Sequence, residues 1–138
     1  MRRMKTLIIA CAAAVLAGAG LSAQQPSLDY GYFKTKVEPI FLTKRPGHAR
    51  CISCHGQGTP LRLQPLDPGA TAWTEEESQK NFAAIKRVAS AGAQSRLILH
   101  PLDESAGGDF YHSGGKHWTS QNDPEWLVLK AFVEGATK

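Results

Sequence analysis

Apolar residues recur at helical spacing soon after residue 26. In Ser27–Phe41 an aromatic or branched side chain stands at every third or fourth position, at Tyr30, Phe33, Val37 and Ile40. This spacing places the four side chains on one face of a helix. Because Pro39 has no backbone N–H, we expect it to kink this helix or to end it near Glu38.

A second helix is predicted from Thr74 to about Ala89. Thr74 followed three residues later by Glu77 is a capping box, in which each side chain accepts a hydrogen bond from the other residue's backbone N–H. The apolar face of this helix is formed by Phe82, Ile85, Val88 and Ala89. Gly92 lies just beyond the end, where glycine favours helix termination.

The last helix is predicted to begin after Asp123 and to end at Gly135. Asp123 suits the cap position, Pro124 suits the first helical position, and the acidic Glu125 is favourable in the first turn. The apolar face is formed by Trp126, Leu129 and Val133. Ser95–Leu99 is a short apolar stretch that fits a single helical turn.

Long segments between these helices carry no regular pattern. Thr43–Arg50 is a basic loop, Gly56–Gly69 is rich in Gly and Pro, and Pro101–Thr119 is Gly-rich. Irregular segments as long as the last are uncommon in compact domains and are often functional. The sequence therefore predicts a mainly α domain of about three helices and long loops, with a small core that a bulky apolar cofactor would complete.

Residues 1–23 have the form of a secretory signal peptide. A short basic stretch, Met1–Lys5, precedes the apolar run Thr6–Gly20, and a small residue follows for cleavage. We therefore expect a mature domain of residues 24–138 in the periplasm or otherwise exported. An uncleaved membrane anchor is an alternative, although the run is short for a span. A lipoprotein cut before Cys11 is another, although it leaves a very short apolar region.

Charge excludes one class of partner. The chain has 16 Lys and Arg against 12 Asp and Glu, but Arg2, Arg3 and Lys5 belong to the predicted leader, which leaves 13 minus 12, or +1. So small a net charge does not indicate a basic surface that would bind nucleic acid. The first third of the mature domain is basic through Lys34, Lys36, Lys44, Arg45 and Arg50. We interpret this stretch as a solvated face, with a docking surface for an acidic redox partner as the alternative.

The five residues Cys51–His55 read Cys-Ile-Ser-Cys-His, the C-x-x-C-H pattern to which c-type haem attaches. In such sites two thiols bond to the vinyl groups on one porphyrin edge, and the adjacent imidazole becomes an iron ligand. A thioredoxin-type pair needs a βαβ context, a zinc site needs four ligands, and a plain disulfide leaves His55 unexplained. We expect one covalent haem c at Cys51 and Cys54, with His55 as the proximal ligand.

The distal iron ligand is approached by elimination, because the chain has no Met beyond the predicted leader. The remaining histidines are His48, His100, His112 and His117. His48 lies three residues before the motif. The chain between them is too short to pass easily around the edge of the haem, so we expect His48 in a loop or on the surface. His100 precedes a proline and suits a capping or packing role. Only His112 and His117 lie in the Gly-rich segment, where glycines allow backbone to approach a flat ring closely.

Several segments resemble small bacterial c-type cytochromes, in particular the planctomycete-type cytochrome c domain. They are Phe33–Phe41 with its Phe-x-x-x-Val-x-Pro-Ile-Phe pattern, Cys51–Gly56, Leu61–Leu63, Ser95–Ile98, His112–Gly115 and Trp126–Gly135. The resemblance spans most of residues 24–138 and implies a cytochrome c-like domain wrapped around one haem. It also places His112 where the family carries its Met ligand. His112 is thus the expected distal ligand, with His117 and His100 as alternates.

These expectations combine into a function. We expect an exported monohaem c-type cytochrome that transfers electrons between redox protein partners and is not an enzyme, nor an integral membrane protein if the leader is cleaved. A His in place of Met would lower the reduction potential. The alternatives are a haem-based gas sensor, if no imidazole reaches the distal iron, and a haem subunit of a larger respiratory or dehydrogenase complex. Peroxidase-like activity is disfavoured, because haem peroxidases of this type usually carry two haems.

Overall fold

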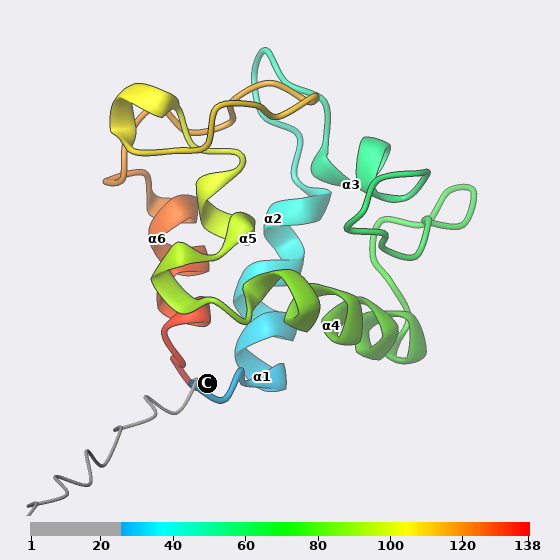
Figure 1. Ribbon diagram of the computed structural model, residues 1–138. Coiled ribbons are helices and arrows are strands. Elements are labelled where there is room, and N and C mark those ends of the chain that lie inside the picture. Colours follow the sequence, from blue (N-terminus) through cyan, green and yellow to red (C-terminus); the bar gives the residue numbers. More distant parts are fainter. Residues whose placement is uncertain (1–25) are drawn as a thin grey trace, which may run out of the picture.

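The computed structural model describes residues 26–138, which form helices joined by long loops (Figure 1). The leader expected at residues 1–23 lies outside these residues. The helical elements, in chain order, are α1 (Tyr30–Tyr32), a π-helical turn (Phe33–Val37), α2 (Glu38–Leu42), α3 (Cys51–His55), α4 (Glu75–Ala89), α5 (Arg96–Leu99) and α6 (Pro124–Val133), with 3₁₀ turns at Gly92–Gln94 and Glu104–Ala106. Within residues 26–138 the β pairing is limited to one bridge, between Leu102 and Trp118. The mainly α class is confirmed. The single turn expected in Ser95–Leu99 is present as α5, and the short helix α3 was not predicted.

The first helix does not end near Glu38, so that alternative of the prediction is wrong. Helical backbone begins after the Asp29 cap and continues through the proline to Leu42. The turn before the proline is π-helical, and the Glu38 N–H donates to the Phe33 carbonyl five residues back. A widened turn makes room for the proline ring where an ordinary α-turn would clash with it.

The caps of the two other long helices are confirmed. The Thr74 N–H donates to Glu77 Oε2 at 2.8 Å, and the Glu77 N–H donates to Thr74 Oγ1 at 3.3 Å, which completes the capping box. Asp123 accepts from the Glu125 N–H at 2.9 Å, one residue after the proline at the first helical position. These caps satisfy N–H groups that the first helical turn leaves without partners.

A cluster of phenyl rings joins the long helices. The ring centroids of Phe33 and Phe82 lie 5.4 Å apart, and that of Phe132 lies 6.2 Å from Phe33 and 6.4 Å from Phe82. These rings come from the first helix, α4 and α6, which meet in the lower half of Figure 1. The three ring pairs are tilted relative to each other, at 38° to 57°, and aromatic rings at such separations contribute large apolar contact areas. The cluster leaves the upper ends of the helices free to line a site.

Segments without regular structure also supply core side chains. Leu63, Trp73 and Leu102 are buried, although all three lie in loops. The Leu63 N–H donates to the His55 carbonyl at 2.8 Å, and Trp73 Nε1 donates to the Gln64 carbonyl at 2.7 Å. The core therefore holds more apolar side chains than the helical patterns alone predicted.

The Pro101–Thr119 segment folds back on itself. The Asp103 N–H donates to the Trp118 carbonyl at 2.8 Å, which brings the two ends together. Gly108 lies so close to this closure that an added Cβ would stand 1.9 Å from the Leu102 carbonyl oxygen. The glycine thus permits a backbone approach that a side chain would block. In the part of the chain that the structure describes, no helix has the length and apolar character to cross a membrane.

Candidate functional site

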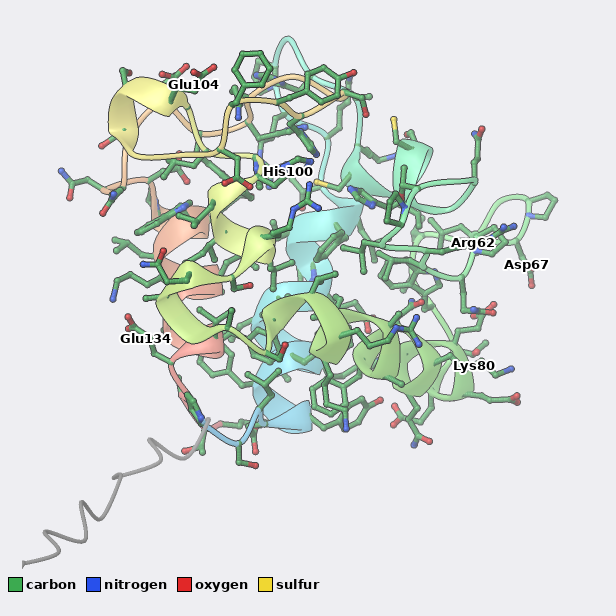
Figure 2. All side chains as sticks on the ribbon, viewed as in Figure 1. Arg62, Asp67, Lys80, His100, Glu104 and Glu134 are labelled. Carbon is green, nitrogen blue, oxygen red and sulfur yellow. The ribbon has the colours of Figure 1, made fainter. Side chains whose placement is uncertain are left out.

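A single cavity gathers the predicted site residues at the upper ends of the helices. Its lining includes Cys51, Cys54, His55, His100, His112 and His117. These residues come from α3, from the end of α5 and from the Pro101–Thr119 loop, so the fold brings together three separate stretches of chain. Figure 2 shows His100 just beyond α5, near the centre of the upper half of the molecule.

The cavity has an apolar wall and a cationic rim. Its apolar lining is formed by Ile40, Phe41, Leu61, Val88, Leu97 and Leu129. The charged side chains in the lining are Arg50 and Arg96, and no carboxylate is among the described residues that line it. Nor do the residues that the structure describes contain a group of three or more side chains arranged to hold a bare metal ion. These walls suit a largely apolar ligand with anionic substituents.

His55 lies at the end of the one-turn helix α3, and hydrogen bonds with the following loop orient its ring. Its Nδ1 donates to the Leu61 carbonyl at 2.8 Å. The Thr59 hydroxyl donates to the same carbonyl at 2.6 Å and lies 2.9 Å from Nδ1. A carbonyl carries no proton, so this bond requires the proton on Nδ1 and leaves the Nε2 lone pair for a ligand. Burial lowers the pKa of His55, which favours the neutral, ligating form.

His112 is held in the same way on the opposite loop. Its Nδ1 donates to the Gly115 carbonyl at 2.6 Å, so its Nε2 also keeps a lone pair. The turn is closed by the Gly115 N–H, which donates to the His112 carbonyl at 2.9 Å, and Gly115 has a φ of 78°. A Cβ at Gly114 would stand 3.3 Å from the ring of His112. The two glycines therefore allow both the turn and the position of the ring.

The rings of His55 and His112 lie near each other in the cavity lining. Their centroids are 6.3 Å apart and their planes differ by 21°. Two imidazoles on opposite sides of one metal ion would have centroids about 6.2 Å apart, because each metal–nitrogen bond is about 2.0 Å and each centroid lies about 1.1 Å behind its nitrogen. The separation of the two rings is therefore compatible with one ion between them.

The alternate His100 also reaches the cavity, but its nitrogens are engaged. Its Nδ1 donates to Asp109 Oδ2 at 3.2 Å, and a guanidinium nitrogen of Arg96 lies 3.3 Å from its Nε2. Burial lowers the pKa of His100, and the hydrogen bond with Asp109 opposes that change. These contacts fit the packing role that the sequence suggested for His100.

The other alternate, His117, packs against His48. The two ring centroids are 4.7 Å apart, and the His117 ring lies 5.8 Å from that of His112. His117 Nδ1 is buried without a hydrogen-bond partner among the described residues. Burial, followed by the charges of His48 and Arg45, lowers the pKa of His117 to about 4. His48 lies in the predicted loop, but it is half-buried against this ring.

All five histidines of the chain thus form one connected group of rings. His48 contacts His117, and His117 contacts His112. The ring of His112 in turn lies 5.1 Å from His100 and 6.3 Å from His55. Sequence reasoning named four of these histidines as iron ligands or alternates and missed the connection through His48. Residue spacing carries no signal for it, because the contact joins two loops that are distant in the sequence.

The two cysteines differ in exposure. Cys51 is half-buried and Cys54 is exposed, and neither forms a disulfide within residues 26–138. Arg45 Nη1 donates to Cys51 Sγ at 3.6 Å. Burial raises the pKa of the Cys51 thiol. Both sulfurs therefore stand at the cavity as free thiols on the helix that also carries His55.

Arg45 is a structural residue that sequence reasoning missed. We interpreted it as part of a solvated basic face, and this is wrong, since its side chain is only 12% exposed. It forms an ion pair and a hydrogen bond with Glu125, and its guanidinium carbon lies 5.3 Å from the centroid of Trp118. Trp118 and Trp126 are each 3% exposed, so both pack in the core. Arg45 thus links the Thr43–Arg50 loop to Glu125 and to Trp118, which lines the cavity.

Comparisons with known protein families, with curated proteins and with solved structures found no match to this chain. The chemistry of the site is therefore inferred from the side chains that line the cavity. Two thiols, two opposed imidazoles with free Nε2 lone pairs, an apolar wall and a cationic rim meet in one cavity. This donor set can anchor a planar group through two thioether bonds and bind a metal ion at its centre from both faces.

Proposed function

We propose that this chain is an exported monohaem c-type cytochrome that transfers electrons. The observation that carries the proposal is the pairing of His55 with His112 at a centroid separation of 6.3 Å. The two cysteines of the C-x-x-C-H motif stand on the same cavity. The resemblance to the planctomycete-type cytochrome c domain supports the same function.

The residues present fit a haem. Cys51 and Cys54 would hold it by thioether bonds, and His55 and His112 would bind its iron. The apolar lining suits the macrocycle, and the two arginines in a lining without carboxylates suit its two propionates. When bound there, a haem would supply a one-electron couple between ferric and ferrous iron.

The protein groups set the conditions for that couple. The Leu61 and Gly115 carbonyls accept from the Nδ1 atoms of His55 and His112, which fixes both rings and raises the basicity of the ligating nitrogens. If both imidazoles held the iron, these nitrogen donors would favour its ferric state and so lower the potential relative to a Met ligand. The iron would then have no open position for a substrate. Hence we propose an electron carrier without catalytic activity of its own.

A gas-binding haem protein is the second candidate. It requires that no imidazole bind opposite His55, and the 6.3 Å separation of the His55 and His112 rings argues against that requirement. This placement favours the carrier. A haem subunit of a larger respiratory or dehydrogenase complex would use the same site with a resident redox partner.

Two measurements on the exported protein, made in cells that attach haem to c-type cytochromes, test the proposal. The intact mass should exceed that of the polypeptide by one haem, and the reduced protein should fail to bind carbon monoxide rapidly. A mass without haem would overturn the proposal. A haem that binds carbon monoxide as fast as an open ferrous site does would support the gas-binding alternative.

A further inference from the structure

The guanidinium of Arg45 reaches the sulfur of Cys51 from behind the cavity wall. Its Nη1 donates to Cys51 Sγ at 3.6 Å, and its Nη2 donates to the Ile40 carbonyl at 3.4 Å. The described residues that line the cavity include Cys51 and Ile40 but not Arg45. A ligand that fills the cavity therefore has no need to displace the guanidinium from the sulfur.

Other contacts fix the position of this guanidinium. Arg45 forms an ion pair and a hydrogen bond with Glu125 on α6, and its guanidinium carbon lies 5.3 Å from the centroid of Trp118. Its side chain is only 12% exposed. A long side chain that is already held in this way loses little further conformational freedom when it forms one more hydrogen bond. The fold thus presents a pre-positioned donor to Cys51 Sγ.

The chemistry of the sulfur makes this donor more suitable after haem attachment than before it. The free Cys51 thiol is itself a donor, to the Ile40 carbonyl at 3.9 Å. When a thiol adds to a vinyl group, an S–C bond forms, the double bond becomes a single bond and the thiol proton goes to the other vinyl carbon. The thioether sulfur can then only accept a hydrogen bond, and a guanidinium can only donate one. The Ile40 carbonyl keeps its donor, because Arg45 Nη2 also reaches it.

We propose that Arg45 is a positioning residue for the haem, which donates a hydrogen bond to the thioether sulfur of Cys51 and so fixes the edge of the haem that Cys51 carries. The inference rests on the proposed function. It makes the two attachment points unequal, since Cys51 is half-buried beside this donor and Cys54 is exposed. Arg45 acts through the sulfur and not through the iron, so the spin state does not depend on it.

Resonance Raman spectra of the haem-loaded protein test this role, because the C–S stretching mode of a thioether responds to a hydrogen bond at its sulfur. Two backgrounds assign the mode. Cys54→Ala leaves only the Cys51 thioether, and Cys51→Ala leaves only the Cys54 thioether. Arg45→Met keeps an unbranched apolar stem and removes every N–H donor. It should shift the C–S mode in the Cys54→Ala background and leave the mode unchanged in the Cys51→Ala background.

Glu125→Gln is the control for a general loss of stability. It breaks the same ion pair but keeps the guanidinium, so it should lower the free energy of unfolding in urea titrations and leave the C–S mode in place. Arg45→Lys keeps a cationic N–H donor with different geometry, and it should shift the Cys51 mode less than Arg45→Met does. If Arg45→Met yields no folded protein, the shift in Arg45→Lys decides the question.

The inference fails if the Cys51 mode is unchanged in Arg45→Met, or in Arg45→Lys where only that variant folds. It also fails if the mode shifts equally in Glu125→Gln, because the band would then report a loosened fold rather than a lost donor. In both cases the haem remains attached and the proposed function stands. Wild-type protein without covalent haem is recognised by its mass before any variant is compared, and that result would remove the proposed function together with this role of Arg45.

Discussion

The ammonium group of Lys116 donates to the backbone carbonyl of His100 at 3.1 Å, and so ties the far end of the Pro101–Thr119 loop to its beginning. It also donates to the Asp109 carbonyl. His112 lies within the span that these two bonds close. The half-buried Lys116 therefore holds the segment that carries the proposed distal ligand.

Lys116→Met keeps the aliphatic length and removes both hydrogen bonds. We expect a loss of about 1–3 kcal/mol in the free energy of unfolding, because a charged donor to two partly buried carbonyls is removed. The looser loop should also let carbon monoxide reach the reduced iron. Urea titration and carbon monoxide binding measure the two effects. Lys80→Met, which removes only a surface pair with Glu76, is the control, and an equal loss there would contradict this role of Lys116.

Replacement of the distal imidazole should open the iron. His112→Ala is expected to turn the oxidised spectrum from low-spin to high-spin and to gain carbon monoxide binding in the reduced state. His100→Ala should stay low-spin, since its nitrogens already contact Asp109 and Arg96. His112→Met should raise the reduction potential, because a thioether favours ferrous iron. A low-spin His112→Ala protein would refute the assignment.

Covalent attachment should depend on both thiols. In denatured Cys51→Ala or Cys54→Ala protein we expect the haem to be retained by one thioether bond at most, and in the double variant to be lost entirely. Intact mass and haem staining of a denaturing gel measure this. Ser53→Ala changes the exposed residue between the cysteines and should leave the haem mass in place. Full retention of haem in the double variant would exclude thioether attachment.

The parts of this structure that could be predicted are those with local signals. The capping box at Thr74 and the Asp123–Pro124 helix start are fixed by residues a few positions apart, and both appear as expected. The C-x-x-C-H motif and the candidate ligand His112 were also found from sequence, and all of them line one cavity.

What escaped prediction depends on contacts between distant segments. The ion pair of Arg45 with Glu125 spans 80 residues, and neither residue type signals burial. The contact between His48 and His117 joins two loops in the same way. The helix end expected near Glu38 was wrong for a different reason, since a π-helical turn can accommodate a proline that the α-helical rule excludes.

The Arg45–Glu125 pair should contribute to stability rather than to the chemistry of the iron. Arg45→Ala removes bonds to Glu125 and to the Ile40 carbonyl, and it uncovers Trp118. We expect a loss of about 1.5–3 kcal/mol in the free energy of unfolding, the range for hydrogen bonds to charged groups. The double variant with Glu125→Gln should lose less than the sum of the single changes. A changed spin state in Arg45→Ala would contradict a purely structural role.

The last prediction concerns pH and the removal of haem. The folded polypeptide lowers the pKa of His117 to about 4, whereas an unfolded histidine titrates near 6.5. Between these values the unfolded chain binds more protons than the folded one, so stability is complete above about pH 6.5 and is lost as the pH falls towards 4. In the haem-free Cys51→Ala/Cys54→Ala double variant, urea titrations should show this loss between pH 7.5 and 5. His117→Gln in that background should reduce it. A loss of the same size in the His117→Gln background would show that a group other than His117 is responsible.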